Sequence, residues 1–403
     1  MYFYVNFYII FIIKKGNAVK RLLIAIYGFA FFNKFLLLTP VYAIFMQQNG
    51  IGDGLLSAMF LISAAATVMG QMPIAFITNK CGARNAMAFG QFLKIIAVIM
   101  WMVMPNYFGF IFGMILWGIQ SGFRNVAFEG LIYDEVAAAG HTKEYTRILG
   151  RKATFESIGV ALSAMGSLMM FLGYDWVTWA SVVAIAISVL CLMIIPNRIA
   201  NSGQTTGFQQ MFRDGIKTCI KTPCMMPIML LALLVVNVPY LDDFLSPIAL
   251  QLGISTEFVG IVPFFLLICA TFGQRFAYKF KNISDTLLYL MIGVAGGLYV
   301  LFAHIYNPQT LWMIGVAYTL IWCVYTITYA RFQHLIPTRH RSVVLSLFTT
   351  LTYLVYMAVC AIIGIGATIG SWRYSIWALG MIVVAICVWA LTYVRKKCPT
   401  QLG

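Results

Sequence analysis

The chain alternates long apolar runs with short polar joints along its whole length. Twelve of the runs reach about 20 residues, the length that an α-helix needs to cross the ~30 Å hydrocarbon core of a bilayer. We therefore predict an all-α integral membrane protein with twelve transmembrane helices. The predicted helices cover residues 22–46, 53–78, 85–104, 107–134, 152–173, 175–196, 223–250, 256–278, 285–304, 309–336, 342–366 and 371–395.

Short sequence matches indicate that the chain is built from two related halves. Gln-Asn-Gly-Ile at Gln48–Ile51 recurs as Gln-Leu-Gly-Ile at Gln251–Ile254, an offset of 203 residues, and two further matches share this offset. This pattern predicts two pseudo-symmetric six-helix bundles, an architecture of many secondary transporters. The predicted parts are an N-terminal extension (1–21), a first bundle (22–196), a cytoplasmic central loop (197–222), a second bundle (223–395) and a cytoplasmic tail (396–403).

Lys and Arg residues cluster in every second polar joint, and the joints between these hold almost no Lys or Arg. By the positive-inside rule, we expect the basic joints and both termini to lie on the cytoplasmic side of the inner membrane. The net charge of +15 is then explained by topology and by attraction to anionic lipid. We expect the lipid bilayer as a partner, and no nucleic acid.

Composition agrees with a membrane protein and argues against metal chemistry. Hydrophobic residues make up 62% of the chain, charged residues 10%, and the mean hydropathy is +0.88, which a soluble domain of this length would not carry. The nine cysteines are scattered, with no Cys-x-x-Cys pair and no accompanying histidine cluster. We therefore expect no structural disulfide and no metal site.

One cytoplasmic loop resembles a known signature. The segment Ala75–Arg84 is similar to the Gly-x-x-x-Asp-Arg-x-Gly-Arg-Arg loop of the major facilitator superfamily, and it matches at Lys80, Gly82 and Arg84. Asn79 replaces the acid of the motif, and alanines replace two further positions. Resemblances also occur, in chain order, at Phe128–Arg151, Val238–Ile254 and Pro337–Ser346. The resemblance implies the fold of this superfamily and secondary active transport by alternating access.

Two features of proton-coupled drug exporters in this family are absent. Gly118 stands where helix 4 often carries an arginine, and the run from Gly159 reads GVALSA instead of Gly-x-x-x-Gly-Pro. Both departures count against proton-driven drug export.

The resemblance also implies a cytoplasmic gate around the signature loop. Gly82 permits the tight turn between two helices, and we predict that Arg84 pairs with Asp134. A plain positive-inside loop is the alternative explanation for the basic residues, although it does not explain the Asn-Lys-x-Gly order. The predicted gate residues are Asn79, Lys80, Gly82, Arg84, Asp134 and Arg151.

Charged residues inside the apolar runs are costly and call for a partner or a function. Lys34 lies in the first predicted helix, near the midplane of the bilayer. It either contacts substrate or a coupling carboxylate, or it forms a buried structural ion pair. Arg124 and Glu129 have the same two interpretations, with Glu156 available as a structural partner. For Lys94 we predict an interhelical hydrogen bond or snorkelling.

Two adjacent carboxylates complete the set of candidate site residues. Asp242 and Asp243 lie between Pro239 and Pro247, prolines that can break a membrane helix around a binding site. Successive helical residues point ~100° apart, so only one of the two is expected to face a cavity. Further candidates are aromatic and polar residues on the helices that line the central cavity in this superfamily. Each one alone is usually a packing residue, and together they would suit an amphiphilic solute. They are Tyr27, Asn33, Trp117, Gln120, Asn237, Tyr240, Trp322, Tyr325 and Tyr329.

No catalytic constellation and no phosphate-binding loop occurs in the sequence, so we predict a transporter and not an enzyme. We expect a monomer that moves a small molecule, needs no cofactor and uses the proton gradient. Proton-coupled efflux of an amphiphilic or drug-like compound is the first hypothesis, favoured by aromatic residues and the two carboxylates. Uptake of an anionic metabolite is the alternative, favoured by Lys34 and Arg124.

The first eighteen residues fit neither a membrane span nor a signal peptide, because their basic residues follow the apolar run. They are either an interfacial segment or precede a true start at Val19. Deleting residues 1–18 is expected to leave the yield of folded protein and its transport unchanged, measured by size-exclusion chromatography and vesicle transport. A loss of folded protein would show that the segment contributes to the fold.

Overall fold

The computed structural model describes residues 19–140, 144–197, 208–280, 283–337 and 341–398, and these are almost entirely helical, without a strand. The N-terminal extension up to residue 18, the first part of the predicted central loop and the end of the tail lie outside the described residues. After a first helix over 19–34, the helices are α2 (Tyr42–Gln48), α3 (Asp53–Cys81), α4 (Ala83–Val103), α5 (Tyr107–Ala138), α6 (Tyr145–Ser163), α7 (Met165–Leu168), α8 (Tyr174–Ile194), α9 (Phe208–Lys221), α10 (Met225–Asn237), α11 (Leu245–Gln251), α12 (Ile261–Phe276), α13 (Asp285–Ile305), α14 (Leu311–Leu335), α15 (Arg341–Thr368), α16 (Trp372–Trp389) and α17 (Arg395–Lys397). Short 3₁₀ helices cover Met169–Leu172, Asp242–Phe244, Ala277–Phe280 and Pro308–Thr310, and a π-helix covers Ala390–Val394.

Ten helical segments of the described chain are long and apolar enough to cross a membrane, and they coincide with ten of the twelve predicted spans. The predicted span 107–134 is the 32-residue helix α5, whose charged residues lower its apolar character. The predicted span 22–46 is interrupted, since its helix stops at Lys34 and α2 begins only at Tyr42. The all-α membrane fold is confirmed, while the first span is not the continuous helix that we predicted.

The predicted duplication is visible in the backbone, again with an offset of 203 residues. The first helix ends at Lys34 and α10 at Asn237, and the short helices α2 and α11 occupy corresponding positions. Both short helices end in the same turn, in which Ile51 N–H binds the carbonyl of Met46 and Ile254 N–H binds that of Ala249. The glycines of the two repeated motifs have φ values of 88° and 87°, which glycine adopts without strain. The repeated sequence therefore encodes a Schellman turn after a broken helix.

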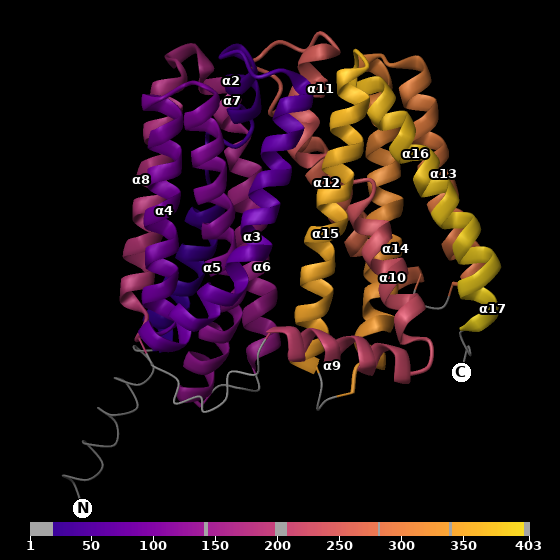
Figure 1. Cartoon of the computed structure of the whole chain (residues 1–403), viewed down its shortest axis with the longest axis horizontal. Helices are drawn as coiled ribbons and strands as arrows, with labels where there is room; N and C mark the ends of the chain where they lie inside the picture. Colours follow the sequence, from indigo (N-terminus) through magenta and orange to yellow (C-terminus); the bar gives the residue numbers. More distant parts are fainter. Residues whose placement is uncertain (1–18, 141–143, 198–207, 281–282, 338–340, 399–403) are drawn as a thin grey trace, which may run out of the picture. The chain divides into compact units, whose positions relative to one another are not determined.

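Contacts divide the chain into two compact units. The first comprises Met1–Pro40 and Met69–Gly203, and the second comprises Val41–Val68 and Gln204–Gly403. In the first unit, α4 packs on α5 and α8, and in the second, α13 packs on α14 and α16 (Figure 1). Residues 41–68 thus pack with the C-terminal half, although the repeat assigns them to the first predicted bundle. The limits of the two predicted bundles stay a prediction.

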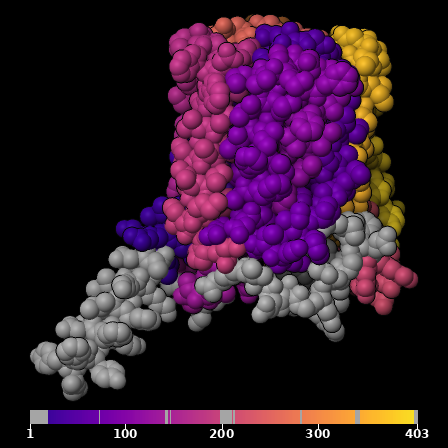
Figure 2. All heavy atoms as spheres, turned by 60° about the vertical axis from the view of Figure 1, so that its left-hand side comes forward, coloured from indigo at the N-terminus to yellow at the C-terminus, as the bar shows by residue number. Residues whose placement is uncertain are grey.

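Large apolar side chains are exposed along the helices, as expected where lipid replaces water. Residues near position 100 lie at the front of Figure 2, where α4 and α5 present such side chains. Exposed large hydrophobic residues of α4, α5 and α8 include Phe89, Phe92, Phe112, Trp176 and Leu190.

The expectation that no disulfide forms is contradicted at one place. Cys224, at the start of α10, and Cys398, after α17, are paired as a disulfide with their Cα atoms 5.4 Å apart. The two residues are 174 positions apart in the sequence, and only the folding of α10 beside the end of the chain brings them together. No group of three or more potential metal ligands occurs among the described residues.

Two glycines allow the backbone around the break after Lys34 to lie close to α6 and α7. A Cβ on Gly159 would lie 2.6 Å from the carbonyl oxygen of Phe31, and a Cβ on Gly166 would collide with the carbonyl of Leu37. Glycines of this kind allow membrane helices to approach a neighbouring backbone closely.

Replacing Gly166 with Ala is expected to destabilise the protein by roughly 2 kcal/mol, because overpacking against fixed backbone forces it to shift. A matched control is Gly150→Ala in α6, where nothing lies within 4 Å of an added Cβ. That control should be neutral or stabilising by ~0.5–1 kcal/mol, since Ala favours helix over Gly. Thermal unfolding of the purified variants measures both, and equal melting temperatures would contradict the proposed contact.

Candidate functional site

A buried lysine binds the backbone that the break in the first helix exposes. Nζ of Lys94 in α4 donates to the carbonyl oxygen of Asn33 and to its Oδ1, both at 3.0 Å. Gln91 donates to the same Oδ1 at 3.1 Å, and both Lys94 and Gln91 are buried. A cation at the C-terminal end of a helix also interacts favourably with the helix dipole. The predicted interhelical hydrogen bond of Lys94 is confirmed, and its role is to hold the break.

The break also exposes a donor, which a serine binds. The N–H of Leu38 donates to Oγ of Ser181 in α8 at 2.9 Å, and both groups are buried. Together with Lys94, this contact satisfies backbone groups that the hydrocarbon core could not hydrogen-bond.

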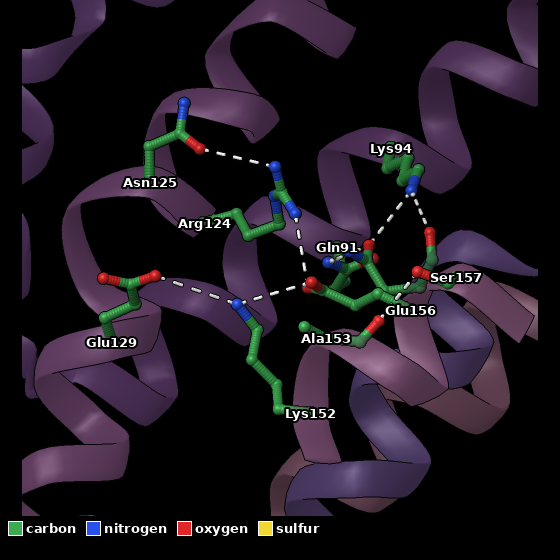
Figure 3. Close-up of polar contacts among 10 residues, drawn as sticks. Gln91, Lys94, Arg124, Asn125, Glu129, Lys152, Ala153, Glu156 and Ser157 are labelled. Carbon is green, nitrogen blue, oxygen red and sulfur yellow. Dashed lines mark hydrogen bonds and ion pairs between the residues drawn. The ribbon is translucent and has the colours of Figure 1, made fainter. Parts of the chain in front are cut away.

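Four charged side chains of α5 and α6 form an ion-pair network in the first unit (Figure 3). Arg124 lies 3.6 Å from Oε1 of Glu156, and Lys152 lies 3.4 Å from its Oε2 and 3.8 Å from Oε1 of Glu129. Glu129 is 70% exposed, whereas Glu156 is 18% exposed. Glu156 therefore joins the two cations, and the interhelical pair that we considered for Arg124 is present.

Further basic side chains lie near this network in the first unit. Lys34 and Arg124 lie close enough to Lys94 for their charges to act on it. With Lys152, four basic side chains and the carboxylates of Glu129 and Glu156 gather in this part of the unit.

An unsatisfied hydroxyl lies on the helix that leads to this region. Tyr27 stacks on Phe155 with the ring centroids 5.1 Å apart, one residue from Glu156. Its hydroxyl is buried and has no hydrogen-bond partner among the described residues. A buried polar group of this kind offers a contact to a ligand.

In the second unit, the break after α10 is held by tyrosines. The hydroxyl of Tyr318 in α14 donates to Oδ1 of Asp242 at 2.8 Å and accepts from the N–H of Leu241 at 3.2 Å. The hydroxyl of Tyr299 in α13 donates to the carbonyl of Pro239 at 2.7 Å. The break predicted from Pro239 is present, whereas Pro247 lies inside α11.

A small pocket with a cavity volume of about 10 Å³ lies beside this break. Asp242 lines it, and Asp243 is not among its lining residues. The two carboxylates thus face different surroundings, and the expectation that only one of them lines the transport cavity stays a prediction. The pocket is lined by Val236, Pro239, Tyr240, Asp242, Tyr318, Ile321 and Trp322.

Asp243 is bound by two other tyrosines. The hydroxyl of Tyr42 in α2 donates to its Oδ1 at 3.1 Å, and that of Tyr356 in α15 donates to its Oδ2 at 2.6 Å. Both hydroxyls donate to this carboxylate, and such hydrogen bonds are strongest while the carboxylate is ionised.

Several predicted cavity residues make packing contacts or are buried within their own unit, and their role in a cavity stays a prediction. Asn237 donates to the carbonyl of Leu233 in its own helix at 2.7 Å. Tyr325 and Tyr329 stack on each other and border the hydrophobic core of the second unit. Trp117 lies under Lys94, whose Nζ is 4.9 Å from the ring centroid, and Gln120 is buried.

Residues of the predicted gate lie around the turn between α3 and α4. Gly82 has φ 83°, so the turn uses the conformational freedom of glycine as predicted. Arg84 donates to the carbonyl of Ile195 at 3.2 Å and to Asn85, and Asn197 donates to the carbonyl of Cys81. These contacts anchor the loop to the end of α8. The pairing of Arg84 with Asp134, and gating roles for Asn79, Lys80 and Arg151, stay predictions.

Sequence reasoning missed partners that come from distant helices. Lys152, Tyr318 and Tyr356 were not proposed as partners of the charged residues. Arg331 was not considered either, and it forms an ion pair with the buried Asp285 at 2.8 Å. Apolar helix sequence contains many tyrosines, and no local signal marks the one whose hydroxyl meets a carboxylate.

The family profile described as Major Facilitator Superfamily matches residues 23–360, and the chain belongs to this superfamily. None of the curated proteins matches the sequence. Among solved structures, the chain is similar to the nucleoside transporter NupG, with a TM-score of 0.72 and 13% identity over 93% of this chain and 98% of that one. It is also similar to a D-xylose-proton symporter, with a TM-score of 0.71 and 11% identity over 94% and 98%. A bacterial homolog of the human lysosomal transporter Spinster gives a TM-score of 0.68 and 14% identity over 95% and 97%.

At these identities the solved structures show the fold alone. Family and fold together define a multi-pass membrane protein of the secondary transporter class and indicate a transporter rather than an enzyme.

Replacing Glu156 with Gln is expected to destabilise the protein by about 2 kcal/mol or more, because Arg124 and Lys152 lose the carboxylate between them. The matched control, Glu129→Gln, removes a largely exposed carboxylate and should change stability by no more than ~0.5 kcal/mol. Thermal unfolding of both purified variants measures the difference. Equal effects would mean that Glu156 is not the centre of the network.

Proposed function

We propose that this transporter exports a small amphiphilic organic compound across the cytoplasmic membrane in exchange for protons. The observation that carries the proposal is the pair of carboxylates at the broken helix after α10, both bound by tyrosine hydroxyls. A carboxylate with hydroxyl partners can take up and release a proton without leaving a buried cation unpaired. This is the property required of a proton-coupling group.

The chemistry of the residues beside Asp242, and not the size of the pocket, supports an amphiphilic substrate. The walls of the pocket combine the aromatic rings of Tyr240, Tyr318 and Trp322 with one carboxylate. Aromatic faces and a carboxylate suit a compound with an apolar body that is neutral or carries one positive charge.

Uptake of an anionic solute is the second candidate, and the basic side chains of Lys34 and Arg124 in the first unit favour it. Arg124 is 27% exposed, so its guanidinium is reachable by a ligand as well as by Glu156. In this reading Lys34 and Arg124 bind the anionic group, and Glu156 holds Arg124 in place.

A transport assay separates the two candidates. Proteoliposomes are loaded with a pH-sensitive dye and given a panel of amphiphilic cations, neutral compounds and organic anions, with and without a proton gradient. Proton movement driven by an amphiphilic compound, together with growth protection of expressing cells, supports export. Movement driven only by anions supports the second candidate, and no proton movement with any transported compound overturns proton coupling. A C-terminal reporter active only in the cytoplasm tests the predicted orientation.

The Asp242→Asn variant is expected to abolish gradient-driven accumulation of the transported compound while downhill exchange remains, if Asp242 carries the coupling proton. Loss of both would assign Asp242 to substrate binding. Accumulation and exchange are measured in the same proteoliposomes.

Lys34→Met is expected to leave the protein folded, because Met keeps the length of the side chain and removes a costly charge. Transport of the compound identified above should fall at least ~10-fold, if Lys34 contacts substrate or a coupling carboxylate. Initial rates close to those of the wild type would reduce Lys34 to a structural residue.

A further inference from the structure

Residues 41–68 pack against the C-terminal helices along one seam within the second unit. The ring of Phe60 in α3 meets that of Phe244 edge-on, with the centroids 5.0 Å apart. Gly54 and Ser57 of α3 lie against Thr368 and Gly364 of α15, where a Cβ on Gly364 would be 3.0 Å from that of Ser57. The small residues let the two helices approach closely. We call this contact, between residues 41–68 and α11 with α15, the seam.

Asp243 is the carboxylate that joins the two sides of the seam. Tyr42 reaches it from α2, and Tyr356 reaches it from α15, at 3.1 Å and 2.6 Å. Tyr42 also packs edge-on against Phe60, with the centroids 5.8 Å apart. One acidic side chain therefore ties α2 to the break after α10 and to α15.

Tyrosines approach Asp243 from several elements, and Asp242 is its neighbour in the chain. The titratable groups that face this region come from three elements. They are Tyr42 of α2; Tyr353, Tyr356 and Cys360 of α15; and Tyr240 and Asp242 of the break itself.

We propose that Asp243 is a proton-operated latch: the ionised carboxylate holds residues 41–68 on the C-terminal helices through Tyr42, and protonation releases them. The proposal rests on the proton coupling proposed above and assigns the two carboxylates different tasks. Asp242 faces the pocket, and Asp243 acts as a positioning residue for the seam.

The chemistry of the hydrogen bonds explains the switch. An ionised carboxylate accepts from both hydroxyls, and charge-assisted hydrogen bonds of this kind are roughly twice as strong as neutral ones. A protonated carboxyl has lost its charge and must place its own O–H, so both contacts weaken together. No new group enters the seam, and the proton is the only species taken up.

The latch also bears on the direction of transport. An exporter driven by protons must stop the empty, deprotonated carrier from changing conformation, because that step would let protons leak. A proton symporter requires the same step to return its empty carrier. A seam that holds whenever Asp243 is ionised blocks this return of the empty carrier, and so the latch does not fit symport. Exchange requires in addition that bound substrate opens the seam while Asp243 is ionised.

The protein contains a reporter for the seam. Cys360 in α15 is fully buried, and its thiol contacts the hydroxyl of Tyr356. Cys387 in α16 is also buried and lies against Gly293 of α13, away from Asp243. Alkylation of Cys360 by N-ethylmaleimide, divided by that of Cys387 in the same molecule, measures opening of the seam. The division removes the pH dependence of the maleimide reaction itself.

The test follows this ratio by mass spectrometry in the purified full-length protein, over a range of pH and without substrate. In the wild type the ratio should rise as the pH falls. In Asp243→Asn it should be raised roughly tenfold at high pH, the change expected on losing a charge-assisted hydrogen bond, and should no longer depend on pH. Tyr42→Phe should also raise it, and Asp243→Glu should restore the pH dependence.

Asp242→Asn is the matched control, because the neighbouring carboxylate binds Tyr318 and not the seam. In Asp242→Asn the Cys360-to-Cys387 ratio should show the same pH dependence as in the wild type. An unchanged ratio in Asp243→Asn, or equal increases in both Asn variants, overturns the latch. If Asp243→Asn also exposes Cys387, that variant is unfolding, and the Tyr42→Phe variant then decides the question. An unchanged Cys360-to-Cys387 ratio in Tyr42→Phe overturns the latch. The readout needs no transported compound, so it can fail or succeed independently of the transport assay.

Discussion

A helix that is interrupted inside a membrane must find partners for its exposed backbone groups within the protein, because hydrocarbon offers none. Within the described residues, membrane helices are interrupted after Lys34 and after Asn237. At the first break, Lys94 binds a carbonyl and Ser181 binds an N–H. At the second break, tyrosine hydroxyls perform both tasks. The arrangement of the polar side chains around both breaks follows from this requirement.

The choice of partner gives the two breaks different chemistry. A lysine binds the carbonyl at the first break, near Lys34 and Arg124. Tyr318 at the second break binds the backbone of Leu241 and the carboxylate of Asp242 with the same hydroxyl. One hydroxyl therefore serves both the backbone requirement and the carboxylate at the second break.

Much of the fold was predictable from the sequence because membrane spans have a length and a polarity that no other segment shares. Ten spans were located to within a few residues, and the motif around Gly50 and Gly253 predicted a duplication that the backbone reproduces. The interruption after Lys34 was missed, since Asn33 and Lys34 were interpreted as polar residues within a continuous helix and Pro40 alone does not give the position of the break. Pro239 gave a clearer signal, and that break was predicted.

The sequence by itself determined that the chain spans a membrane, that it is duplicated, and that Lys34, Arg124, Asp242 and Asp243 need partners, because each of these follows from the cost of polar groups in hydrocarbon. Only the tertiary structure decided which partners they have. Glu156 pairs with Arg124, Tyr318 with Asp242, and Tyr42, 201 residues away, with Asp243. These contacts depend on which helix faces meet. Packing of whole helices sets that choice, and no local pattern in an apolar sequence records it.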